Sequence, residues 1–133
     1  MTVQAKALPE CWQVQYEAGG IAGVADTAKR GAGGGAGLRP HELLEASLAC
    51  CMTIMARLWL DDEGLDDEGV GVTVEVVREA DRSRFLYSLR LPAALEPHRD
   101  QILARLESSA VRATLSKQLT FEPVELAQKS SNR

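Results

Sequence analysis

Aromatic residues and histidines are scarce in this chain of 133 residues. Phenylalanine, tryptophan and tyrosine together make up 5% of it and there are two histidines, whereas 45% is hydrophobic. The core must therefore be aliphatic. Two histidines, and three cysteines without a Cys-x-x-Cys spacing, offer no zinc-ligand set. The net charge of -4 argues against nucleic acid as the main partner. We expect no metal, no cofactor and no nucleic acid.

The N-terminal residues 1–6 contain no apolar stretch of signal-peptide length. An odd number of cysteines without such a signal fits a reducing cytoplasm better than a disulfide framework. The length suits one domain. Its expected parts are N-terminal strands (1–28), a glycine-rich loop (29–39), a core (40–126) and a tail (127–133).

The N-terminal part has the pattern of strands followed by a loop. Residues 11–16 alternate apolar with polar, Gly19-Gly20 suggests a hairpin turn, and residues 21–25 return. The glycine-rich stretch 31–37 has neither the Lys-Ser or Lys-Thr ending of a P-loop nor a Rossmann Gly-x-Gly-x-x-Gly turn. We therefore expect a mobile loop over the start of the next helix rather than a nucleotide site.

The almost uncharged run 43–60 predicts a long helix that begins at Pro40 and ends near Asp61 or Asp62, before Gly64. One apolar seam and a second row beside it are expected to be Leu44, Leu48, Cys51, Met55 and Leu58, and Leu43, Cys50 and Ile54. A helix with apolar side chains on so many sides must be buried on most of its surface, so we infer that a second subunit helps to bury it.

The run approaches the length that spans a membrane. It nevertheless contains Glu45 and Arg57, and acidic residues follow it, so we interpret it as a core helix. Arg57 is expected to be paired, or to extend to the dimer edge. The acidic stretches 61–63 and 66–68 lack the ligand spacing of an EF-hand loop and are interpreted as a solvated turn.

The remainder predicts an α+β domain. Its expected elements are strands at 70–77 and 84–91 joined by a turn at 81–83, a helix opened by Pro97 and running from His98 to about Ser108, a short helix from Ser109, and a last strand at 119–126. In the first of these helices, Ile102 and Leu106 form an inward i, i+4 pair.

Three stretches resemble the osmotically inducible protein C / organic hydroperoxide resistance (OsmC/Ohr) family. They are residues 38–44 with 49–53, residues 62–65 with Gly69-Val70 before a strand, and residues 111–116 before the last strand. The resemblance covers about 40–125. It implies small antiparallel sheets wrapped around two main helices in an intertwined homodimer, with a thiol site near the interface.

Active members of the family reduce organic hydroperoxides with a peroxidatic and a resolving cysteine. The resemblance places the peroxidatic position at Cys51 and the resolving position at Ser109, within Ser109-Ala110-Val111 where the family has Cys-Pro-Val. A peroxidatic thiolate becomes a sulfenic acid that a second thiol must capture. Serine cannot do this; at a helix start it is expected to be an N-cap and nothing more.

The resemblance also implies an activating glutamate ten residues before the peroxidatic cysteine, paired with an arginine from the N-terminal strands. His41 occupies that position here, with Glu42 next to it, and no arginine lies between residues 11 and 26. Arg30 and Arg39 are possible substitutes. His41 is otherwise a surface residue and Glu42 a helix-dipole partner. Without a nearby cation, a buried cysteine is expected to have a raised pKa.

The three cysteines leave alternatives open. Cys51 is either a reactive thiol or a buried space-filler. Cys50 is disfavoured as a resolving thiol because neighbours on a helix point about 100° apart. Cys11, on a predicted strand, is expected to be packed.

The sequence therefore predicts a cytoplasmic stress protein that reduces organic hydroperoxides through Cys51 and is recycled by an external thiol. The alternative is a non-catalytic homodimer whose interface cleft binds a small apolar or electrophilic ligand, with Cys51 only lining it.

Overall fold

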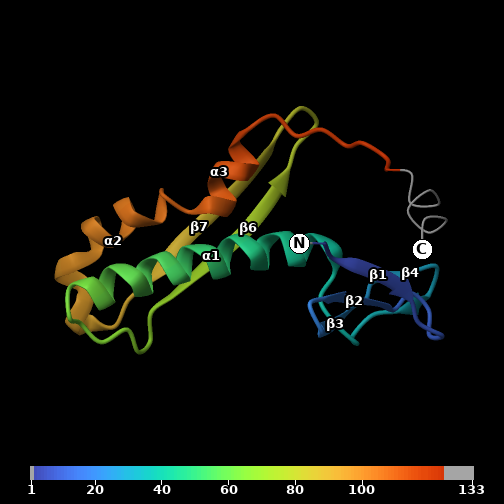
Figure 1. Ribbon diagram of the computed structural model, residues 1–133, viewed down its shortest axis with the longest axis horizontal. Coiled ribbons are helices and arrows are strands. Elements are labelled where there is room, and N and C mark those ends of the chain that lie inside the picture. The colour runs from blue at the N-terminus through green and yellow to red at the C-terminus, as the bar shows by residue number, and fades with distance from the viewer. Residues whose placement is uncertain (1, 125–133) are drawn as a thin grey trace.

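The N-terminal part of the chain is a three-stranded antiparallel sheet. In the computed structural model, which describes residues 2–124, its strands are β1 (Gln4–Ala7), β2 (Val14–Ala18) and β3 (Ile21–Ala25), in that order. Gly19 and Gly20, both with positive φ, make the β2–β3 turn as predicted. Figure 1 shows this sheet beyond the start of the long helix, apart from the remaining elements.

The predicted strand at 11–16 starts too early. Cys11 lies in the turn before β2, where the Gln13 N–H donates to the Glu10 carbonyl at 3.0 Å, and it is exposed. The expectation that Cys11 is a packed strand residue is therefore wrong for the single chain. The apolar–polar alternation that suggested a strand from residue 11 describes a turn at its first positions.

The glycine-rich segment is more ordered than a mobile loop. It contains a short antiparallel hairpin, β4 (Ala28–Lys29) with β5 (Ala32–Gly33). Asp26, only 2% exposed, lies at its base. Its carboxylate accepts hydrogen bonds from the N–H groups of Thr27 at 2.8 Å and Ala36 at 3.2 Å. A buried carboxylate thus fixes backbone that composition alone marks as free.

The long helix α1 spans Pro40–Asp62, as predicted. Proline suits its first position because the N–H that proline lacks has no partner there. Glu42 accepts the Arg39 N–H at 2.8 Å, which satisfies one donor at the helix start. At the other end Gly64 takes a positive φ of 69°, a conformation that favours glycine.

The buried face of α1 differs from the predicted seam. The buried side chains are Leu48, Met52, Ala56 and Leu60. Four members of the predicted rows, Leu44, Cys50, Ile54 and Leu58, are exposed, Ile54 by 55%. The apolar pattern wraps too far round the helix for one chain to select a face, and the sheet selects it instead.

The core lies between α1, a hairpin and two short helical elements (Figure 1). These are β6 (Gly71–Arg78), β7 (Ser83–Arg90), the 3-10 helix η1 (Ala93–His98) and α2 (Arg99–Leu106). The predicted hairpin is confirmed. The helix predicted from His98 to about Ser108 is α2, with His98 at its N-cap, but Pro97 lies inside the preceding η1 and does not open it. Ile102 and Leu106 are fully buried against α1, as predicted.

A third helix, α3 (Ala110–Ser116), follows with Ser109 at its N-cap, as predicted. The last predicted strand is not formed: residues 119–124 make no strand, and residues 125 and 126 lie outside the described part, as does the expected tail 127–133. The α+β class with small antiparallel sheets is confirmed.

Candidate thiol site

Cys51 lies in the middle of α1, half-buried, between two residues of the core face. Its neighbours Leu48 and Met52 pack under the β6–β7 hairpin and α2. Position 51 is therefore at the edge of the packed face rather than at its centre. From this edge the thiol meets the start of α3.

Ser109 is the partner of the Cys51 sulfur. Its hydroxyl donates a hydrogen bond to Cys51 Sγ at 3.0 Å, and its own oxygen accepts the Arg112 N–H at 3.2 Å. Ser109 is completely buried. The predicted N-cap is confirmed, but the expectation that serine does nothing more here is wrong. The position aligned with a resolving cysteine lies in contact with the position aligned with a peroxidatic one.

The pKa of Cys51 is lowered, contrary to the expectation of a raised one. Burial is the largest influence and raises the pKa, but the Ser109 hydroxyl and the N–H groups of Val111 and Ala110 lower it by more in sum. All three donors are neutral. Hydrogen bonds to the charged form act here in place of the cation that the sequence reasoning required, and they favour the thiolate.

His41 and Glu42 are not at the thiol in this chain. His41 precedes Cys51 by ten residues of continuous helix, which is about 15 Å along the axis. Glu42 is engaged with the Arg39 backbone, the helix-start role that the sequence had offered as its alternative. Arg39 is two residues farther away than His41. Arg30 lies over the Trp12 ring at 5.8 Å, in the N-terminal part.

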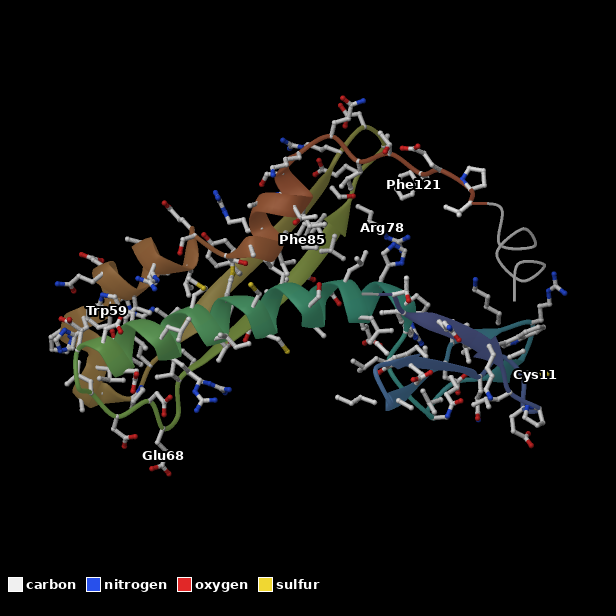
Figure 2. All side chains as sticks on the ribbon, in the orientation of Figure 1. Cys11, Trp59, Glu68, Arg78, Phe85 and Phe121 are labelled. Carbon is white, nitrogen blue, oxygen red and sulfur yellow. The ribbon has the colours of Figure 1, made fainter. Side chains whose placement is uncertain are left out.

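The other two cysteines are also away from the Cys51 sulfur. Cys50 points to the exposed side of α1. Figure 2 shows Cys11 at the far end of the N-terminal sheet, well separated from the middle of α1. Neither is placed to capture a sulfenic acid on Cys51 within one chain.

A cavity of about 300 Å³ lies between α1, β7 and α3, and the Cys51 side chain is not part of its lining. Leu48 and Met52, the helix neighbours of Cys51, line it together with Phe85, Tyr87, Leu115 and Arg112. Sequence reasoning missed Arg112. Its signal was available: it stands three residues after Ser109, so its N–H reaches the Ser109 oxygen and its side chain reaches the cavity.

Two further sequence expectations concern charge. Arg57 is paired, as one of the alternatives held, with its Nε 2.6 Å from Asp67. Asp67 therefore serves a surface ion pair. Across residues 2–124, no group of three or more His, Cys, Asp or Glu side chains is arranged to hold a metal ion.

Comparison with known proteins places this geometry in a family. The model of the OsmC-like protein family matches residues 33–126. No curated protein matches. The fold is similar to a Psychrobacter arcticus 273-4 protein named for osmotic stress induction and the detoxification response (TM-score 0.70, 18% identity, 86% of this chain and 87% of that one).

Two more solved structures are similar in fold. One is an OsmC-like protein from Mycoplasma pneumoniae (TM-score 0.64, 12% identity, 86% of this chain and 85% of that one). The other is an organic hydroperoxide resistance protein OsmC from Legionella pneumophila, described as a redox protein (TM-score 0.56, 18% identity, 87% and 90%).

Proposed function

Because the chain belongs to the OsmC-like protein family, we propose that it reduces organic hydroperoxides with one reactive cysteine, Cys51. The observation that carries the proposal is the 3.0 Å hydrogen bond from the Ser109 hydroxyl to the Cys51 sulfur. This donor, with two backbone N–H groups, favours the thiolate despite burial. The Legionella relative, named for organic hydroperoxide resistance, supports the choice of substrate class.

The proposed cycle balances with an external dithiol. The Cys51 thiolate attacks the terminal peroxide oxygen, the O–O bond breaks, and the alcohol leaves after its oxygen takes a proton from solvent. Cys51 is then a sulfenic acid. One thiol of the reductant attacks its sulfur and releases water, leaving a mixed disulfide. The second thiol of the reductant breaks this bond, frees Cys51 and becomes oxidised to a disulfide.

Ser109 has a positioning role in this cycle. It holds its hydroxyl on the sulfur while the Arg112 N–H holds Ser109 itself. A hydroxyl cannot condense with a sulfenic acid to form a disulfide, so the recycling thiol must come from outside. The cavity that begins at Leu48 and Met52, the helix neighbours of Cys51, is lined by apolar, aromatic and serine side chains and Arg112, and it has room for the organic part of a small hydroperoxide.

The test is peroxide consumption with an aryl hydroperoxide and a dithiol. We expect turnover in the wild-type protein and none in Cys51→Ser. Cys50→Ser is the matched control, since Cys50 is the adjacent, exposed thiol on the same helix, and it should keep full activity. Turnover that survives in Cys51→Ser, or that is absent from the wild type, contradicts the proposal.

We also propose that the protein works as a cytoplasmic homodimer. Only 22% of the most apolar stretch of α1 is buried in one chain, although α1 is long and apolar enough to cross a membrane. Its open face also carries Arg57 and Asp61, which a bilayer would exclude. A second copy therefore suits this face better than lipid. In such a dimer, His41 and Glu42 could serve a thiol only across the subunit boundary.

Oligomeric state tests the dimer. Ile54→Lys places a charge in the middle of the exposed apolar face and should give a monomer in light scattering. Ala104→Lys, on the exposed side of α2, is the control and should not. Equal molecular masses for Ile54→Lys and the wild type would show that this face is not part of a dimer interface.

A second function is favoured by the cavity itself. A non-catalytic protein would bind a small apolar or electrophilic molecule there, with Cys51 beside it. Under this alternative, peroxide consumption stays at the level without protein and Cys51 reacts slowly with alkylating reagents. The lowered pKa of Cys51 supports the catalytic proposal over this one.

A further inference from the structure

A second cleft, of about 550 Å³, lies at the start of α1. Lys29 of β4, Arg39 before α1 and Arg78 at the end of β6 line it, together with His41, Glu42 and Glu45 of α1. Figure 2 shows Arg78 above the first turns of α1. Residues that the sequence had assigned to the thiol, His41 and Glu42, thus border a separate cleft about three helical turns away.

The cations of this cleft come from three separate segments of the chain. Within residues 2–124, Lys29, Arg39 and Arg78 form no ion pair. The arginines that are paired with carboxylates lie elsewhere: Arg57, Arg82, Arg84 and Arg99. Three separate segments therefore bring three unpaired positive charges to one hollow.

The two carboxylates of the cleft do not neutralise these cations by ion pairing. Glu42 accepts the Arg39 backbone N–H at 2.8 Å. Glu45 accepts the Val76 backbone N–H of β6, also at 2.8 Å. Each glutamate thus has an oxygen committed to the main chain, where it helps to hold α1 to its neighbours. The lining therefore carries three cations against two carboxylates, and the carboxylates are each held by a backbone N–H while the cations have no ion-pair partner within residues 2–124.

We propose that this cleft binds a small organic anion with several oxyanion oxygens, either a phosphate ester or a polycarboxylate. Arginine presents a planar fork that matches such oxygens in pairs, and lysine adds a compact charge. The volume is in the range of small-molecule sites. The proposal rests on side chains from β4, β6 and the segment before α1, and it does not depend on the chemistry of Cys51.

Calorimetric titration of the full-length protein tests this site. Inorganic phosphate and citrate are the two probes, each measured at constant ionic strength with sodium chloride as the reference. We expect saturable binding of at least one probe and weakening by about tenfold in Arg78→Gln, which removes one charged donor group. The tighter probe identifies the source: phosphate indicates a phosphate ester and citrate a polycarboxylate.

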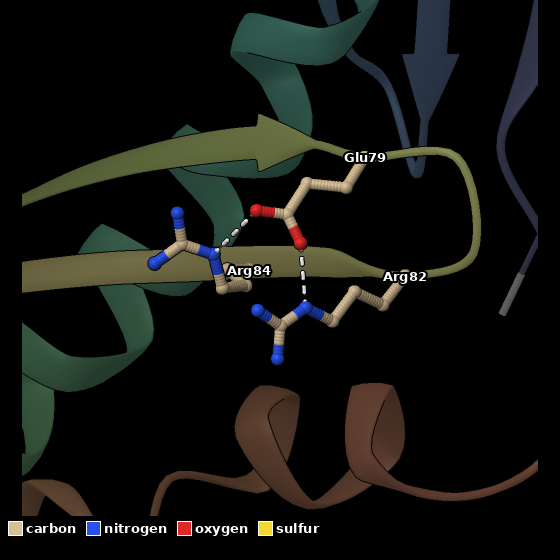
Figure 3. A network of polar contacts seen from close by, with 3 residues as sticks. All are labelled: Glu79, Arg82 and Arg84. Carbon is tan, nitrogen blue, oxygen red and sulfur yellow. Dashed lines mark hydrogen bonds and ion pairs between the residues drawn. The ribbon is translucent and has the colours of Figure 1, made fainter.

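Arg84→Gln is the matched control. Arg84 lies on the same hairpin but points to Glu79, 3.1 Å away, in the network of Figure 3, and it does not line the cleft. The Arg84→Gln protein should bind phosphate and citrate as the wild type does. Lys29→Gln provides a second cleft variant should Arg78→Gln fail to fold, and Cys51→Ser should bind normally. No saturable binding of either probe, or equal weakening in Arg84→Gln, overturns the proposal.

Discussion

The middle and the start of α1 offer different kinds of groups to a negative charge. In the middle, the Cys51 sulfur meets a hydroxyl and two backbone N–H groups, all neutral. At the start, Lys29, Arg39 and Arg78 surround a polar cleft. The sequence reasoning had joined these two regions into one site, with charge from the helix start acting on the thiol.

The difference teaches that a thiol pKa can be lowered without a cation. Fixed dipoles that already point at the sulfur stabilise an anion without having to reorient, and a half-buried position strengthens them. Two groups on the same helix belong to one site only if few enough residues separate them, because each residue adds about 1.5 Å along the axis. The predictions below alter one region at a time.

The largest effect is expected from Ser109→Cys. The Ser109 oxygen is 3.0 Å from the Cys51 sulfur, so the side chains already meet and a disulfide needs only a small further approach. Treatment with one equivalent of hydroperoxide should join Cys51 to the introduced thiol in a disulfide, detected by peptide mass mapping without reductant. Ser108→Cys is the control, because the exposed Ser108 hydroxyl faces the Arg105 carbonyl instead. A Ser109→Cys protein that keeps both thiols free, or forms the sulfinic acid at Cys51, contradicts the geometry.

Ser109→Ala should give the next largest effect. Removal of the hydroxyl raises the pKa of Cys51, since the remaining donors face the same opposing burial. The pH profile of alkylation at Cys51 should shift to higher pH, and the rate at neutral pH should fall about tenfold. Lost capping should also reduce the free energy of unfolding by about 1 kcal/mol.

Ser108→Ala controls this experiment. Its exposed hydroxyl donates to the Arg105 carbonyl at 2.6 Å, and Ser108 does not line the cavity. An unchanged alkylation profile in Ser109→Ala would mean that the backbone N–H groups alone hold the thiolate, and the hydroxyl would lose its assigned role.

Local sequence signals foresaw most of the elements. Pro40 and Gly64 bound α1 as expected, β-branched residues gave β6, and Ser109 began α3. These signals work because caps, turns and strand preferences act between near neighbours. The strand predicted at 119–126 is absent from residues 119–124. An alternating pattern shows only that a segment can pair, and no strand within the described chain pairs with this one.

The site was harder to foresee than the fold. The alignment of Ser109 with a resolving position suggested that it lies near Cys51, and the structure brings the two into contact. The direction of the Cys51 pKa could not follow from residue types, because its lowering needs the Ser109 hydroxyl and two backbone N–H groups to point at the sulfur, and backbone groups carry no sequence signal. The face of α1 was equally hidden, because apolar residues surround the helix and the elements packed on it, the hairpin, η1 and α2, decide that Met52 is buried and Ile54 is not.

Asp26 extends the comparison to a carboxylate and predicts a smaller, pH-dependent effect. Burial is again the largest influence and raises its pKa, yet backbone N–H groups, those of Thr27 and Ala36 among them, lower it below its ordinary value of 3.8. Its stabilising contribution is therefore complete above pH 3.8 and is lost as pH falls through the lower folded value. Asp26→Asn should remove this acid dependence.

Urea unfolding at a series of pH values and constant protein concentration measures how the Asp26 contribution to the free energy of unfolding depends on pH. Asp81→Asn, an exposed residue of the β6–β7 turn, is the control and should leave the acid limb of the stability curve as it is in the wild type. The same acid limb in Asp26→Asn as in the wild type would show that the hairpin does not need the charge.

The smallest effect is expected from His41→Gln. About 15 Å of helix separates His41 from Cys51 in one chain, which exceeds the screening length of about 8 Å at physiological ionic strength. The alkylation profile of Cys51 should therefore be unchanged, while Ser109→Ala, measured alongside, shifts it. A His41→Gln shift as large as that of Ser109→Ala would mean that His41 of a second copy lies near the sulfur, because no path within one chain is short enough. The two regions of α1 would then form one site after all, assembled from two subunits, and neutral donors would share the stabilisation of the thiolate with a charge.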